Sequence, residues 1–81
     1  MSRSDHQLRS AQKLQRNHAR LFVSQVRRKT GLTVDDFAAR FRADPRRLQA
    51  WEAGTEIPPS HALAYLKVIA KNAKAVEEAL G

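Results

Sequence analysis

The sequence predicts an all-α fold, a bundle of about five helices with a long basic amphipathic helix at its N-terminal end. Two observations predict it. No segment shows the period-two alternation of apolar and polar residues that is typical of a strand, and the glycines and prolines fall between apolar-periodic segments. These breaks lie at Gly31, Pro45, Gly54 and residues 58–59. With 81 residues, the chain has room for one modest core.

The first predicted helix runs from about residue 6 to residue 29, a stretch without glycine or proline. On a helical wheel, five basic side chains fall within about 60° of one another, and apolar side chains spread over the opposite side. The basic residues are Arg9, Lys13, Arg16, Arg20 and Arg27. The apolar residues are Leu8, Ala11, Leu14, Ala19, Leu21, Phe22 and Val26.

This helix is longer than a small domain can cover. A compact domain can cover Leu21, Phe22 and Val26, whereas the apolar residues several turns upstream need another surface. The sequence therefore predicts an N-terminal extension over residues 1–18, helical or flexible, and a domain over residues 19–81. The surface for a partner or a second copy is expected at Leu8, Ala11 and Leu14.

Two short helices are expected next. Thr33 with Asp36 resembles a capping box that starts the second helix. Residues 42–44 form a three-residue connection that ends in an aspartate N-cap, and Pro45 is the first residue of a third helix over about 45–52. The side chains expected to face the core from these helices are Val34, Phe37, Ala38, Phe41, Leu48 and Trp51.

The C-terminal third is expected to hold one long helix and a short one. Residues 57–60 form a rigid, proline-rich connector, and a fourth helix follows from residue 61 to about residue 72. Its predicted inward residues are Leu63, Leu66, Ile69 and Ala70. Residues 73–80 form either a short fifth helix or a continuation of the fourth.

Two short helices joined by a three-residue turn, with the small Ala38 near the middle of the first, match the helix-turn-helix pattern. Arginine can donate a forked pair of hydrogen bonds to guanine, and glutamine can pair with adenine, each contributing ~1–3 kcal/mol of discrimination. The base-reading candidates on the outer side of the third helix are Pro45, Arg46, Gln49 and Ala50.

The charge distribution indicates an anionic partner, with double-stranded DNA the first expectation. The net charge is +7, and residues 1–29 carry all of it, with eight basic residues against the single acidic Asp5. A membrane-surface role is disfavoured because the basic helix has no tryptophan anchor. No run of about 18 apolar residues, no apolar signal segment and no cysteine are present, so we expect a cytoplasmic protein that contacts no membrane.

No catalytic or metal-binding constellation stands out. No nucleophile is paired with a base, and no glycine-rich loop could cradle a phosphate. His6, His18 and His61 are scattered without ligand spacing, and Glu52 is expected to bond backbone groups or a nearby arginine. We expect a protein that is not an enzyme and uses no metal or cofactor.

Residues 26–80 resemble the Xre/Cro-type repressors. The resemblance rests on "TGLTVDDFAARFRADPRRLQAWEAGTEIPPSHALAYLKVIA", and its most specific part is the W-E-x-G-x-x-x-P run at residues 51–58. The stretch "LQAWEAGTEIPPSHALAYLKVIAKNAKAVEEAL" is most similar to the HigA-like and MqsA-like antitoxins. The resemblance implies a lambda-repressor-like fold and a homodimeric repressor of its own operon. It also implies that the repressor binds a DNA operator and a small ribonuclease toxin.

The chain departs from that family pattern at two positions. Val34 replaces a glutamine that touches a DNA phosphate in the family, and Arg42 replaces the usual turn glycine, so Arg42 must adopt a left-handed backbone or alter the turn. The phosphate-contacting candidates are Thr33, Arg40, Arg42 and Arg47. Two alternatives stay open: a phage or plasmid Cro-type repressor without a toxin partner, and a protein-interaction module whose helix-turn-helix has lost DNA binding.

Overall fold

The computed structural model describes the backbone of residues 3–81 and the side chains of residues 14–81, and within these ranges all regular structure is helical. The all-α prediction is therefore confirmed, but the expected count of about five helices is wrong. The helices are α1 (Arg3–Thr30), α2 (Val34–Phe41), α3 (Pro45–Ala53) and α4 (Ser60–Leu80). The predicted boundary at residue 18 falls inside α1, which is uninterrupted there.

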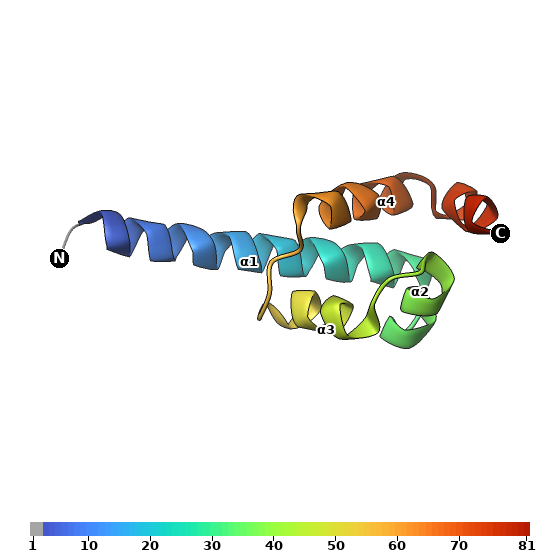
Figure 1. Cartoon of the computed structure of the whole chain (residues 1–81), viewed down its shortest axis with the longest axis horizontal. Helices are drawn as coiled ribbons and strands as arrows, with labels where there is room; N and C mark the ends of the chain where they lie inside the picture. Colours follow the sequence, from blue (N-terminus) through green and yellow to red (C-terminus); the bar gives the residue numbers. More distant parts are fainter. Residues whose placement is uncertain (1–2) are drawn as a thin grey trace.

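Helix α1 is the axis around which the other helices are arranged. Its C-terminal half lies between α4 on one side and the α2–α3 pair on the other, while its N-terminal half projects beyond them (Figure 1). The molecule is correspondingly elongated, with extents of 53 × 19 × 17 Å. The packing of the three later helices thus involves only part of α1.

The side of α1 that faces the core is centred on Val23, which is fully buried. Ala19 and Val26 lie on the same side, at i−4 and i+3, and are also buried. Sequence reasoning expected the domain to cover Leu21 and did not single out Val23. That expectation is wrong: Leu21 is 51% exposed, because two residues from Val23 place it about 200° around the helix.

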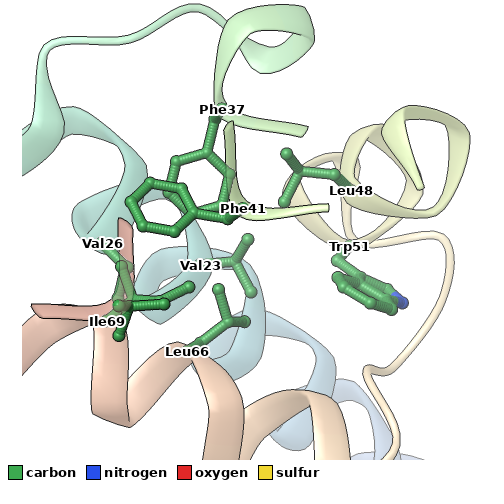
Figure 2. Close-up of a cluster of buried hydrophobic side chains, with 9 residues drawn as sticks. Val23, Val26, Phe37, Phe41, Leu48, Trp51, Leu66 and Ile69 are labelled. Atoms are coloured by element: carbon green, nitrogen blue, oxygen red, sulfur yellow. The ribbon is translucent and has the colours of Figure 1, made fainter. Parts of the chain in front are cut away.

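One apolar cluster joins all four helices (Figure 2). The rings of Phe37 and Phe41 pack with their centroids 4.7 Å apart at an interplanar angle of 42°. Their neighbours from the other helices include Val23, Val26, Leu48, Trp51, Leu66, Ile69 and Val76. Trp51 and Leu48 are buried as predicted, so the inner side of α3 is fixed by this cluster.

The predicted helix boundaries follow from local capping. Thr33 Oγ1 accepts a hydrogen bond from the Asp36 amide at 3.1 Å, and Asp44 Oδ1 accepts one from the Arg46 amide at 2.9 Å. Gly54 closes α3, as expected, and its left-handed backbone, with φ of 79°, is one that favours glycine. These contacts fix where α2 begins and where α3 begins and ends.

Helix α4 covers both the predicted fourth helix and residues 73–80, and its helical geometry is broken at Asn72, where the fourth helix was expected to end. Asn72 has φ of −157° and ψ of 79°, and its Oδ1 accepts a hydrogen bond from the Ala75 amide at 3.1 Å. The asparagine therefore caps the last turns, as an N-cap would. Ala70, expected to face inward, is exposed, because the inward face is centred between Leu66 and Ile69.

Arg42 adopts the left-handed backbone expected of it, with φ of 56° and ψ of 42°. This conformation is unfavourable for a residue with a Cβ atom. We therefore expect Arg42→Gly to be more stable than Arg42→Ala by about 1 kcal/mol, since both variants lose the guanidinium group. Urea denaturation of the two variants checks this difference, and equal midpoints would contradict a strained turn.

Candidate nucleic-acid interface

Helix α3 has one side in the core and one side open to solvent. Leu48 is fully buried and Trp51 is 8% exposed, whereas Arg46 and Gln49 are both exposed. Pro45 is exposed at the start of the helix, and Ala50 is half-buried beside Gln49. The structure therefore brings the four predicted base-reading residues together on the outer side of α3, where all but the half-buried Ala50 are exposed.

The four predicted phosphate-contacting residues do not form one group. Arg47 stays at the N-terminal end of α3, with its Nε atom 3.9 Å from Asp44 Oδ2, and its side chain is 66% exposed. Thr33 lies one helix away, at the start of α2, and its hydroxyl oxygen serves as the N-cap acceptor. Only Arg47 therefore lies beside the base-reading candidates.

Arg40 and Arg42 are held by the end of α4. The Nη1 atom of Arg40 lies 3.5 Å from Glu77 Oε1, and Arg42 donates a hydrogen bond of 2.6 Å to the Leu80 carbonyl oxygen. Sequence reasoning missed both contacts, because they join residues 37 and 38 positions apart and no local pattern marks them. Both guanidinium groups thus already have acceptors within the chain.

A cluster of hydrogen-bonded polar side chains lies beneath α3. Arg27 donates two hydrogen bonds to the Glu52 carboxylate, at 2.7 and 2.9 Å, and a third at 3.0 Å to the Leu32 carbonyl oxygen. Ser24 donates to the same carboxylate at 3.1 Å. Glu52 therefore pairs with a nearby arginine as expected, and Arg27, one of the five residues on the basic side of the helical wheel, is only 20% exposed. The hydrogen bond to Glu52 raises the pKa of Arg27, which stays charged.

Tyr65 links α4 to the end of α2 through a hydrogen bond. Its hydroxyl group donates a hydrogen bond of 2.8 Å to the Phe41 carbonyl oxygen, one of the orphan acceptors of a helix C-terminus. Burial raises the pKa of Tyr65, and the nearby charge of Arg42 lowers it by a smaller amount. The phenol is therefore protonated near neutral pH and can act as the donor.

The predicted partner surface is only partly described. Leu14 is 57% exposed, as expected of a residue that needs another surface. Leu8 and Ala11 belong to α1, but their side chains lie outside the described residues. Leu21 adds a second exposed leucine seven residues after Leu14, on the side of α1 turned away from the core.

The described residues contain neither a membrane-spanning helix nor a cluster of metal ligands. No helix there is long and apolar enough to cross a bilayer, and no three His, Asp or Glu residues gather as metal ligands. Comparisons with known proteins also gave no relatives: no family model, no curated protein and no solved structure matches this chain.

Proposed function

We propose that this chain is a sequence-specific, double-stranded DNA-binding repressor that acts as a homodimer and reads its operator with a helix-turn-helix formed by α2 and α3. The observation that supports it most is the two-sided character of α3. Leu48 and Trp51 anchor the helix from beneath, while Arg46 and Gln49 stay exposed on its outer side. Arginine and glutamine are residue types that distinguish bases in the major groove.

Charge supports the same proposal. Arg47 stands beside Arg46 at the N-terminal end of α3, and its side chain, 66% exposed and 3.9 Å from Asp44, is accessible to a phosphate. At the other end of α3, the Arg20 side chain packs against Gly54, so the basic helix α1 runs close to the proposed DNA-binding unit. Two α3 helices in a dimer would enter successive major grooves about 34 Å apart. Binding through such cations weakens steeply as salt rises.

We further propose that the protein is an antitoxin that represses its own operon and binds a small ribonuclease toxin. The support is the apolar surface that the fold leaves open on α1, where Leu14 and Leu21 are both more than half exposed. Co-expression with the product of the adjacent open reading frame, followed by affinity purification, tests this part. Absence of a complex would favour the alternative function, a Cro-type repressor that has no toxin partner.

One observation favours a second candidate, a protein-interaction module that does not bind DNA. Arg40 and Arg42, two of the four phosphate-contacting candidates, are hydrogen-bonded to α4 rather than free. A DNA-binding assay separates the two functions directly.

The decisive experiment is selection of bound duplexes from a randomised double-stranded DNA library. We expect an enriched site, and we expect Arg46→Ala to lower affinity for it by ~1–3 kcal/mol while leaving affinity for scrambled duplex almost unchanged. Arg47→Ala should weaken binding to the enriched duplex and to the scrambled duplex alike, and it should reduce the salt dependence of binding. Fluorescence anisotropy titrations at two salt concentrations measure both effects.

Arg28→Ala is the matched control, because Arg28 is exposed on α1 and belongs to neither group of candidates. Failure of the selection to enrich any sequence would favour the protein-interaction module. An unchanged ratio of specific to scrambled affinity in Arg46→Ala would show that Arg46 does not read a base.

A further inference from the structure

A cavity of about 260 Å³ lies behind α3, between the α2–α3 turn and the first half of α4. Its inner wall is apolar and includes Phe37, Leu48, Trp51, Leu66 and Ile69. Figure 2 shows Leu48 and Trp51 projecting from α3 toward the side of the core that Leu66 and Ile69 occupy.

The outer part of the cavity is lined by two cationic side chains, one carboxylate and one imidazole. Arg42 and Arg47 supply two guanidinium groups, His61 supplies an imidazole, and Asp44 supplies the one carboxylate. The Arg42 guanidinium is bonded to the Leu80 carbonyl oxygen, whereas Arg47 lies 3.9 Å from Asp44 and is largely exposed. Arg47 is therefore the cation that can turn toward a bound molecule at lowest cost.

We propose that this cavity binds a small apolar carboxylate, with its hydrocarbon part against Trp51 and Leu66 and its carboxylate on Arg47. The volume lies below the range of about 300–1,000 Å³ typical of sites for drug-sized ligands, so a nucleotide or a peptide is too large. The apolar wall disfavours a sugar or an inorganic anion. The positive outer part favours a carboxylate over an amine.

Occupation of the cavity has a consequence for α3. Arg47 cannot hold a ligand carboxylate and a DNA phosphate with the same donors, so the ligand would weaken DNA binding. This consequence rests on the proposed function, but the binding site itself does not.

The chain contains a single tryptophan, and it lines the cavity, so its fluorescence reports on binding directly. Suitable probes are cyclohexanecarboxylate and its neutral analogue cyclohexanecarboxamide, neither of which absorbs where tryptophan is excited. We expect a saturable change in Trp51 emission with both probes, and about tenfold tighter binding of the carboxylate. Nuclear Overhauser contacts between probe protons and the Trp51 indole in the unmodified chain provide a second measurement.

Three variants locate the site. Ala62→Leu fills the cavity and should weaken the binding of both probes about tenfold or more. Arg47→Gln should remove the preference for the carboxylate over the carboxamide. Arg28 lies outside the cavity, so Arg28→Gln should leave the affinity for both probes unchanged. The proposal is overturned if neither probe produces a saturable change or an indole contact in the unmodified chain. It is equally overturned if Arg47→Gln keeps the preference. DNA takes no part in these measurements, so their outcome is independent of the repressor proposal.

Discussion

Truncation of Trp51 to alanine is expected to lower the free energy of unfolding by about 3–5 kcal/mol, the range found for large aromatic side chains in protein cores. The indole is 8% exposed and belongs to the one apolar cluster that joins all four helices. It also borders the cavity behind α3, so its removal enlarges an existing space rather than letting neighbouring side chains close over it. Urea denaturation followed by circular dichroism measures the loss.

Leu14→Ala is the matched control for this truncation. Leu14 is 57% exposed on the projecting half of α1, so its truncation should change the free energy of unfolding of the monomer by no more than about 0.5 kcal/mol. If Trp51→Ala proves as mild as Leu14→Ala, then the indole is not part of the core and α3 lacks its anchor.

The parts of the fold that sequence reasoning predicted well are those set by neighbouring residues. The caps at Thr33 and Asp44 and the left-handed closure at Gly54 each depend on contacts within a few residues, so the sequence alone carries the signal. The buried side of α3 was also predictable, because Leu48 and Trp51 are spaced at i and i+3.

Sequence reasoning missed the parts of the fold that depend on contacts between residues far apart in the chain. Leu21 was expected to be covered, but which side of α1 faces inward is decided by where α3 and α4 pack, and that side is centred on Val23. In the candidate interface, the outward placement of Arg46 followed from helical spacing. The engagement of Arg42 with the Leu80 carbonyl oxygen did not, since these two residues lie 38 positions apart in the chain.

Removal of the Glu52 carboxylate is expected to lower the free energy of unfolding by more than the partial exposure of this group suggests. Glu52→Ala should lower the free energy of unfolding by about 2–3 kcal/mol, because it leaves Arg27 charged, 20% exposed and without its two strongest acceptors. Ser24 loses its acceptor in the same step. The value is below the 3–5 kcal/mol typical of fully buried pairs because some water reaches both side chains.

Replacement of both partners distinguishes the loss of an attraction from the stranding of a charge. The double variant Arg27→Met with Glu52→Leu should recover most of the stability that Glu52→Ala loses, since no unpaired guanidinium then remains beneath α3. The exposed pair of Arg40 and Glu77 is the internal comparison, and Glu77→Ala should cost no more than about 0.5 kcal/mol, because Arg40 is 54% exposed. A double variant as unstable as Glu52→Ala would mean that the pair itself, through its geometry, holds α3 on α1.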